Sequence, residues 1–358
     1  MRVCIIGSGL SALTLAKAFV NQKIHVDFID KNNRTLLSKS RTLGISKNNI
    51  KYFNKNIINI EKIIWKLKKI EIFTENLGNN KLLKFENNSD FVFSIVKNYK
   101  LYNLLKKNLK KEKYFKKIKL KKNCNLQKKY NLVINTEYNN LITKKYFNKK
   151  ITKEYNSLAF TTIIKHEKIL NNVAVQIFTK EGPLAFLPIS NKETSIVYSI
   201  NKNSKINVND INKLIHHYNF KYRIKKIANV NNFELKSISL RTYYYKNILA
   251  FGDLLHKVHP LAGQGFNMTI RDIKNLIDII NDKIDLGLPL DKSVNEQFEK
   301  KVKNKNFIFL NGIDLLHEFF QIERKTNKSI LSKSIQILGK NSSLNKMLIN
   351  VADKGLNF

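Results

Sequence analysis

Cysteine is almost absent from this sequence of 358 residues, which contains only Cys4 and Cys124. Their spacing does not match a metal-ligand pattern, so we expect two buried, reduced thiols in a cytosolic protein. The sequence also lacks any run of about 18 apolar residues, and it therefore predicts no membrane-spanning helix. Met1 and Arg2 lead directly into an apolar run, so no secretory signal is expected.

Acidic residues and arginine are both scarce. The chain has 27 Asp and Glu against 65 Lys and Arg, which gives a formal net charge of +38, yet only 7 of the basic residues are arginine. Recognition of phosphates and bases favours the arginine fork, and the lysines are spread over the whole chain. These features favour compositional drift over a nucleic-acid-binding surface. A basic surface would still help a protein to lie on an anionic membrane.

A β-α-β pattern opens the chain. The apolar run Val3–Ile6 is followed by a G-x-G-x-x-A motif, an amphipathic helix and a second strand that ends at Asp30. In such a motif Gly7 permits the tight turn, Gly9 lets a pyrophosphate approach the backbone, and Ala12 allows close helix–strand packing. Asp30 is then placed to bond the hydroxyls of an adenosine ribose. The pattern predicts a dinucleotide-binding unit.

A second stretch, Leu249–Arg271, predicts another strand, a small-residue loop and a helix. Its apolar strand ends in Gly252 and Asp253, and a loop with Gly263 and Gly265 precedes apolar positions at helical spacing. Two glycines let backbone N–H groups approach a ligand, and the helix N-terminus behind them favours negative charge. The acidic side chain can accept hydrogen bonds from ligand hydroxyls. An ordinary strand–helix turn is the alternative.

Between and after these stretches the pattern changes. Ile70–Phe73 and Lys81–Phe85 are expected to pair as strands, and the lysine-rich segment 106–122 is expected to be solvated helix face and loop. Short, closely spaced strands predict an antiparallel sheet in a second domain: Thr161–Glu167, Val173–Thr179, Leu184–Ile189, Thr194–Ile200 and Phe233–Leu240. Residues 291–358 are expected to be mostly helical. The tail, with Leu344, Met347, Leu348 and Val351 at helical spacing, either packs on the core or faces a membrane.

Three segments together resemble a known family. They are Gly7–Ala12 (GSGLSA), Gly182–Pro188 (GPLAFLP) and Gly252–Asn267 (GDLLHKVHPLAGQGFN). They look like the first FAD motif, a substrate-sheet segment and the second FAD motif of the UbiH-type FAD-dependent aromatic hydroxylases, which are single-component flavin monooxygenases. That family hydroxylates aromatic rings in ubiquinone biosynthesis. The resemblance extends weakly along nearly the whole chain, including Arg41–Ser46 and Lys165–Glu167.

The resemblance implies a role for each matching residue. Gly7, Gly9 and Ala12 would cradle the FAD pyrophosphate, Asp30 would hold the adenosine ribose, and Arg41 would lie beside the cofactor. The flavin half would be formed by Gly252, Asp253, Pro260, Gly263, Gln264, Gly265 and Asn267. Asp253 would bond the ribityl chain. Helix N-terminal amides near Gly263 would stabilise the negative charge of the reduced flavin ring.

The chain departs from the family pattern in several places. After the strand that ends at Ile134, the family's GADG-x-x-S-x-V-R segment is replaced by Asn135-Thr136-Glu137-Tyr138, which weakens the expectation of NAD(P)H use. A flavin-contacting arginine of the family is replaced by Tyr99, with Lys100 beside it. The two residues after the Gly-Asp pair, Leu254 and Leu255, are bulkier than in the family.

The expected fold class is α/β, with a discontinuous Rossmann-like FAD-binding domain, an antiparallel-sheet substrate domain and a helical C-terminal region. A length of 358 residues and a hydrophobic content of 43% allow two domains with a sizeable core. The predicted divisions are 1–54, 94–150 and 246–290 for FAD binding, 55–93 and 151–245 for the substrate, and 291–358 for the C-terminal region.

The resemblance implies an FAD-dependent monooxygenase that hydroxylates a polyprenylated phenol in ubiquinone biosynthesis. NAD(P)H would reduce the flavin, and O₂ would add to give a C4a-hydroperoxide that transfers oxygen to the ring. No side chain is assigned a catalytic role and no metal is expected, since His256 and His259 are interpreted as loop-packing groups. The protein is expected in the cytoplasm, peripheral to the inner membrane, with other quinone-biosynthesis proteins as partners and without a nucleic-acid partner. Two alternatives remain: hydroxylation of a small soluble aromatic, and a basic binding protein with a vestigial flavin site.

Overall fold

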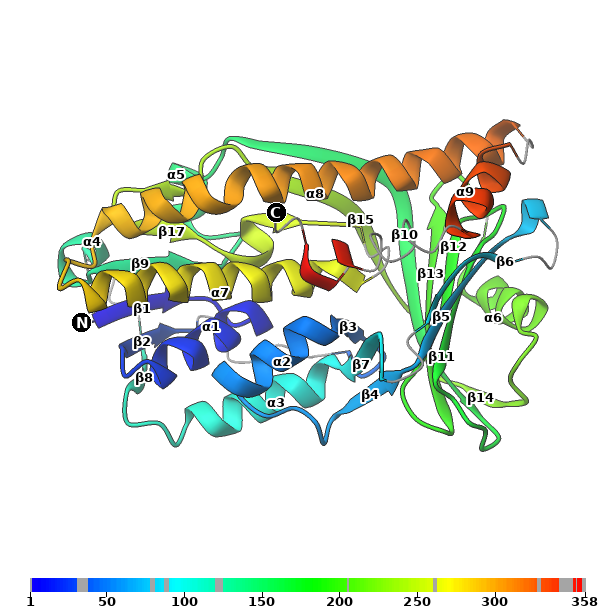
Figure 1. Ribbon diagram of the computed structural model, residues 1–358, viewed down its shortest axis with the longest axis horizontal. Coiled ribbons are helices and arrows are strands. Elements are labelled where there is room, and N and C mark those ends of the chain that lie inside the picture. The colour runs from blue at the N-terminus through cyan, green and yellow to red at the C-terminus, as the bar shows by residue number, and fades with distance from the viewer. Residues whose placement is uncertain are drawn as a thin grey trace.

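In the computed structural model the protein is described over residues 2–30, 38–77, 81–86, 90–119, 125–204, 206–259, 263–326, 330–340, 350–351 and 353–355. Pro260 and the tail residues Leu344, Met347 and Leu348 lie outside these ranges. Two large sheets lie side by side, and a long helix, α8 (Lys292–Thr326), extends along both of them (Figure 1).

The first sheet has the order β16-β17-β9-β1-β2-β8. Its strands are β1 (Arg2–Ile6), β2 (His25–Ile29), β8 (Phe115–Ile118), β9 (Leu132–Asn135), β16 (Tyr244–Tyr245) and β17 (Ile248–Ala250). All neighbours are parallel except the β16–β17 hairpin. The central strands are apolar along their length because helices cover both faces of a parallel sheet. Val3, Cys4 and Ile5 of β1 are accordingly fully buried.

Helices α1 (Leu10–Asn21), α3 (Asn98–Leu109) and α7 (Gln264–Asp285) supply apolar side chains to the core of this first sheet. Helix α1 alone contributes Leu13, Leu15 and Phe19 to this core. A three-stranded sheet, β3-β7-β4, lies beside it: β3 (Thr42–Ser46), β4 (Ile64–Leu67) and β7 (Phe93–Lys97). Shorter helices are α2 (Lys47–Asn56), α4 (Leu126–Lys129) and α5 (Leu141–Tyr146).

The second sheet is mostly antiparallel, in the order β18-β15-β10-β13-β12-β11-β5-β6, with β14 also paired to β10. Its strands are β5 (Lys69–Thr74), β6 (Lys81–Glu86), β10 (Lys150–His166), β11 (Val173–Phe178), β12 (Pro183–Pro188), β13 (Glu193–Asn201), β14 (Ile224–Ile227), β15 (Asn231–Leu240) and β18 (His256–Lys257). Helix α6 (Val208–Tyr218) covers one face through Ile211 and Ile215. Helix α9 (Ile330–Lys340) follows α8, and short 3-10 turns are η1 (Glu75–Leu77) and η2 (Gly252–Leu254).

The predicted fold class is confirmed. A discontinuous parallel sheet, an antiparallel sheet and a helical C-terminal region are all present in the described residues. The pairing of the strands near 70–73 and 81–85 is also confirmed, since β5 and β6 are antiparallel neighbours. The exact domain boundaries stay a prediction. The three-stranded sheet joins β4 to β3 and β7 across one of those predicted divisions.

One secondary-structure prediction was wrong. The lysine-rich segment 106–122, interpreted as helix face and loop, contains the strand β8, which pairs in parallel with β2. Its central residues Lys116 and Lys117 are exposed, because β8 is an edge strand of the sheet. Edge strands commonly carry lysines, which discourage pairing with another chain. Lys116 and Lys117, which suggested a solvated helix face and loop, are therefore exposed residues of a strand.

Candidate cofactor site

The two glycine motifs meet in space, although they lie more than two hundred residues apart in the sequence. Gly252, directly after β17, has φ of +64°, and a Cβ atom built there would lie 2.6 Å from Cβ of Ser11 in α1. A side chain at this position would be both strained and in collision. The end of β17 therefore packs against the first turn of α1, and the two motifs form one continuous region at the carboxyl edge of the parallel sheet.

The first motif leaves space where a ligand would approach. Gly7 has φ of +148°, and a Cβ there would lie 1.8 Å from Oγ1 of Thr136, so the loop after β9 requires a glycine at this point. Gly9 is the N-cap of α1, and no residue of the described ranges lies within 4 Å of the Cβ that it lacks. Helix α1 has neither a side-chain cap nor an acidic residue in its first turn. Its first-turn amides are thus suited to an anion.

Asp30 follows β2 at the same edge of the sheet, as the sequence predicts. Its carboxylate is largely buried and lies 2.8 Å from Nζ of Lys117, which comes from the neighbouring edge strand β8. Ala12 is fully buried on the inner face of α1, and its Cβ lies 3.4 Å from the position that a Gly7 Cβ would occupy. A larger side chain at position 12 would separate the helix from the loop after β1.

The loop before α7 is held by one fully buried amide, that of Asn267. Its Oδ1 accepts hydrogen bonds from the Ser46 backbone N–H at 2.9 Å and from Asn49 Nδ2 at 2.8 Å. Its Nδ2 donates to the carbonyl oxygens of Gly44 and Gly263, each at 3.1 Å. Gly263 itself has φ of +62° and its missing Cβ would lie 3.5 Å from the Gly44 Cα. Asn267 therefore joins β3 to the glycine loop.

The remaining predicted residues of the second motif lie around this loop. Gln264 is buried at the first position of α7, and a Cβ at Gly265 would lie 3.5 Å from the Val258 side chain. Pro260 falls outside the described residues. The bulky Leu254 and Leu255 are buried in the core of the first sheet. Their large side chains therefore fill space in this core.

Both histidines of this stretch make internal contacts. Nε2 of His256 lies 2.5 Å from Oδ2 of Asp272 in α7, and both side chains are buried. The His259 ring lies 4.8 Å from the Tyr155 ring and 4.5 Å from the His317 ring, measured between centroids. These contacts place the loop between β10 and α8, in keeping with the packing role expected of both histidines.

Polar groups gather where β17 passes into β18, which is the point where the chain crosses from the first sheet to the second. Asp253 is exposed here, and its charge adds to burial in raising the pKa of Tyr138. The Tyr138 hydroxyl is buried without a hydrogen-bond partner among the described residues. Burial lowers the pKa of Lys257 on β18, an effect that Asp253 opposes and that Lys236 and Arg41 reinforce. The junction thus holds charges of both signs.

Arg41 reaches the second sheet from just before β3. Its guanidinium carbon lies 5.1 Å from the centroid of the Phe233 ring on β15, and the residue is exposed. Tyr99 and Lys100 are in the first turn of α3, where the tyrosine is half-buried and the lysine is exposed. The structure therefore brings Arg41 into contact with the second sheet.

The segment after β9 contributes residues that the sequence did not single out as part of the site. Oε1 of Glu137 accepts a hydrogen bond from the Ser8 backbone N–H at 3.0 Å. Glu137 and Tyr138 follow β9, which is the parallel neighbour of β1 and β17. Residues that follow adjacent parallel strands meet at one edge of the sheet, so strand order would have revealed them. The sequence alone does not supply that order.

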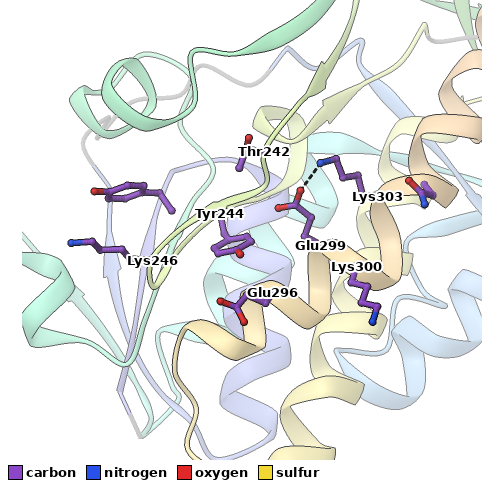
Figure 2. Close-up of a pocket in the computed structure, with 9 residues that line it drawn as sticks. Thr242, Tyr244, Lys246, Glu296, Glu299, Lys300 and Lys303 are labelled. Atoms are coloured by element: carbon purple, nitrogen blue, oxygen red, sulfur yellow. Dashed lines mark hydrogen bonds and ion pairs between the residues drawn. The ribbon is translucent and has the colours of Figure 1, made fainter.

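A separate hollow of about 550 Å³ lies beside β16, the outermost strand on one side of the first sheet. It is lined by the β16–β17 hairpin and by α8, including Tyr244, Lys246, Glu296 and Lys300 (Figure 2). The hairpin precedes β17, whereas Gly252 follows that strand. None of the residues that line the hollow belongs to either glycine motif.

The fold is shared with FAD-dependent monooxygenases of known structure. The p-nitrophenol 4-monooxygenase PnpA of Pseudomonas putida superposes with a TM-score of 0.79 at 10% identity, covering 99% of this chain and 98% of that chain. A variant of Klebsiella pneumoniae HpxO complexed with FAD gives a TM-score of 0.76 at 10% identity and covers 100% of both chains. At such identities the likeness establishes the fold alone.

Sequence comparison identifies the relatives. The family described as FAD binding domain matches residues 156–284. The mitochondrial ubiquinone biosynthesis monooxygenase COQ6 of Schizosaccharomyces pombe is 22% identical over 231 residues, 51% of this chain and 48% of that protein. The 3-demethoxyubiquinol 3-hydroxylase of Escherichia coli is 28% identical over 152 residues, 40% of this chain and 39% of that protein. The matches thus span less than half of these relatives' lengths.

The chain is accordingly an FAD-binding protein with the fold of the flavin monooxygenases. Its relatives by sequence are enzymes of ubiquinone biosynthesis, which confirms the resemblance seen in its motifs. The residues that the structure describes fit the cofactor: among them, the space at Gly9, the uncapped α1 and the Tyr138 hydroxyl without a hydrogen-bond partner all lie along one edge of the sheet.

Proposed function

We propose that this protein is an FAD-dependent monooxygenase that hydroxylates the aromatic ring of a polyprenylated phenol in ubiquinone biosynthesis, with NAD(P)H as reductant and O₂ as co-substrate. The observation that carries the proposal is the contact between the end of β17 at Gly252 and the first turn of α1 at Ser11. It brings the two glycine loops together at one edge of the sheet, as an extended dinucleotide such as FAD requires. The names of the relatives supply the substrate class.

Bound FAD would supply the redox chemistry, and this chain's residues would bind and orient it. Gly7, Gly9 and the first-turn amides of α1 would hold the pyrophosphate, and Asp30 would bond the adenosine ribose in competition with Lys117. The carboxylate of Asp253 would bond the ribityl chain. Asn267 would act as a positioning residue, since its side chain makes four hydrogen bonds within the protein.

At the flavin end, the left-handed turn at Gly263 and the start of α7 would present backbone amides to the ring. The second sheet would form the opposite wall of the substrate space, because β18 and β15 carry Lys257 and Phe233 toward the junction. A wall of this kind keeps water from the reacting groups. The half-buried Lys257 offers an ammonium group at this junction to a phenol oxygen or to the flavin.

Replacing Asp253 with alanine is expected to lower FAD affinity by tenfold or more, because a bound hydroxyl would lose a charged acceptor. The dissociation constant of FAD can be measured by titration calorimetry on the cofactor-free chain. The matched control is Asp285→Ala, which removes an exposed carboxylate at the far end of α7. Equal affinity of the two variants would remove Asp253 from the proposed site.

The activity is tested by expressing the chain in a bacterium that lacks one ubiquinone ring hydroxylase. Restored quinone and disappearance of the accumulated phenolic precursor are expected, and the identity of that precursor reports which ring position is hydroxylated. Asp253→Ala serves as the comparison variant and is expected to restore less quinone than wild type. If quinone stays at the deletion level while the protein is folded and contains FAD, the small-aromatic alternative is favoured instead.

We also propose peripheral contact with an anionic membrane through α8. Ile308, Leu315 and Ile322 are exposed by 59%, 65% and 56% and follow one another at seven-residue intervals, which places them on one face of the helix. Lys301 and Lys305 are exposed at the start of that face. Basic residues beside exposed apolar side chains suit the headgroup region of an anionic bilayer. None of the helices in the described ranges is long and apolar enough to cross a membrane.

Changing Ile308, Leu315 and Ile322 together to serine is expected to reduce binding to vesicles of anionic phospholipid by tenfold or more, since each apolar side chain contributes to insertion. Co-sedimentation with anionic and with neutral vesicles measures the effect. The matched control changes three exposed apolar residues elsewhere, Leu141, Leu170 and Phe220, to serine. Equal losses in the two triple variants would assign binding to general stickiness and would contradict a role for α8.

A further inference from the structure

A carboxylate stands at the loop that would hold the FAD pyrophosphate. Glu137 Oε1 accepts the Ser8 backbone N–H at 3.0 Å and lies 3.4 Å from the Ser8 hydroxyl, in the middle of the motif between β1 and α1. Ser8 is buried. The hydrogen bond joins the loop after β9 to the loop after β1, which are neighbours because the two strands are parallel and adjacent.

A buried polar network fixes the position of this carboxylate. The Glu137 backbone N–H donates to Oδ1 of Asn135 at 3.2 Å, and the same oxygen accepts from Asn140 Nδ2 at 2.7 Å. Nδ2 of Asn135 donates to Thr143 Oγ1 at 2.8 Å, and Thr143 Oγ1 in turn donates to the Glu137 carbonyl oxygen at 2.5 Å. These hydrogen bonds therefore hold the turn after β9 in one conformation. The glutamate side chain has one well-defined direction, toward Ser8.

The negative charge of Glu137 affects how an anion binds at the N-terminus of α1. The N-terminal end of an α-helix carries a partial positive charge, and α1 has no acidic residue in its own first turn to balance it. Glu137 supplies a negative charge from outside the helix. The pyrophosphate of FAD seeks the same helix end. The Glu137 carboxylate and the FAD pyrophosphate would then both lie near the partial positive charge at the N-terminus of α1.

We propose that Glu137 is an internal counter-charge of the phosphate-binding loop, which stabilises the loop when FAD is absent and weakens FAD binding when it arrives. The inference rests on the proposed FAD site and concerns how tightly that site holds its cofactor. The affinity of this chain for FAD is then lower than its two glycine loops would allow. A single charge-removing substitution should shift affinity and cofactor-free stability in opposite directions.

The test compares wild type with Glu137→Gln, whose amide oxygen can still accept the Ser8 N–H but carries no charge. FAD is removed from the full-length proteins, and its dissociation constant is measured by titration calorimetry at low and at high NaCl concentration. The variant is expected to bind FAD about three- to tenfold more tightly at low salt, as for one like-charge pair a few ångströms apart in a partly solvated site. The difference should shrink at high salt.

Two further measurements complete the design. The thermal unfolding midpoint of the cofactor-free Glu137→Gln variant should fall below that of wild type, while Glu154→Gln, which removes an exposed carboxylate on β10, should change neither affinity nor stability. Equal or weaker FAD binding by Glu137→Gln would overturn the inference and leave the FAD site intact. Failure of folded wild type to bind FAD would instead overturn the proposed function, and this inference with it.

Discussion

Gly252→Ala is expected to destabilise the fold by about 2–5 kcal/mol and to abolish measurable FAD binding. About 1–2 kcal/mol comes from placing a residue other than glycine in the left-handed region, and about 1–3 kcal/mol from overpacking. The collision is specific: the new Cβ would lie 2.6 Å from the Cβ and 2.8 Å from the Oγ of Ser11. Relief of this contact must separate the end of β17 from α1.

A matched control separates strain from collision. Gly287, in the turn after α7, has the same φ of +64°, but no atom of the described residues lies within 4 Å of its missing Cβ. Gly287→Ala should therefore cost only the conformational part, about 1–2 kcal/mol, with FAD affinity unchanged. Urea unfolding of the cofactor-free variants gives the free energies of unfolding, and calorimetry gives the affinities. Comparable losses in both variants would mean that the junction of the two motifs tolerates a side chain.

The second large effect is expected from Asn267→Leu, which should cost about 3–5 kcal/mol of folding free energy. The leucine removes four buried hydrogen bonds, at about 1 kcal/mol each on average, and leaves the Ser46 N–H and the Gly44 carbonyl without a partner. The loop at Gly263 would lose its connection to β3. Flavin binding should weaken with it, even though the Asn267 amide is already fully engaged within the protein.

The same helix offers the control for this second prediction. Asn275 in α7 is half-buried, and its Nδ2 donates only to the Arg271 carbonyl oxygen one turn earlier, at 3.0 Å. Asn275→Leu should therefore change stability by less than about 1 kcal/mol, because leucine is a good helix former and one local bond is lost. Thermal and urea unfolding distinguish the two variants. A loss for Asn267→Leu no larger than for Asn275→Leu would show that the β3 connection is dispensable.

Local pattern was informative wherever a residue's environment follows from its neighbours in the chain. The run Val3–Ile6 predicted a buried strand, and the glycine spacing after it predicted a turn into a helix, because both depend on backbone conformation within a few residues. The same holds for the strand before Gly252 and the helix after Gly263. The relation of these motifs to FAD was already visible in their resemblance to a family.

The lysine content of segment 106–122 led to a wrong prediction for a physical reason. Lys116 and Lys117 are exposed whether they lie on a loop or on an edge strand, so their charge could not distinguish the two. The distinction depends on the neighbouring strand β2, to which β8 is hydrogen-bonded. Pairing partners far apart in the sequence decided the secondary structure of this segment.

The amino-acid sequence alone determined the class of this protein: an α/β chain with two glycine loops suited to one dinucleotide. Tertiary structure decided what those loops touch. Only the adjacency of β1, β9 and β17 brings Glu137 to Ser8 and Gly252 to Ser11, and only the packing of β3 on α7 gives Asn267 its four partners. Short-range patterns fix backbone conformation, whereas contacts between distant segments follow from strand order and from the burial of apolar faces, which no single stretch encodes.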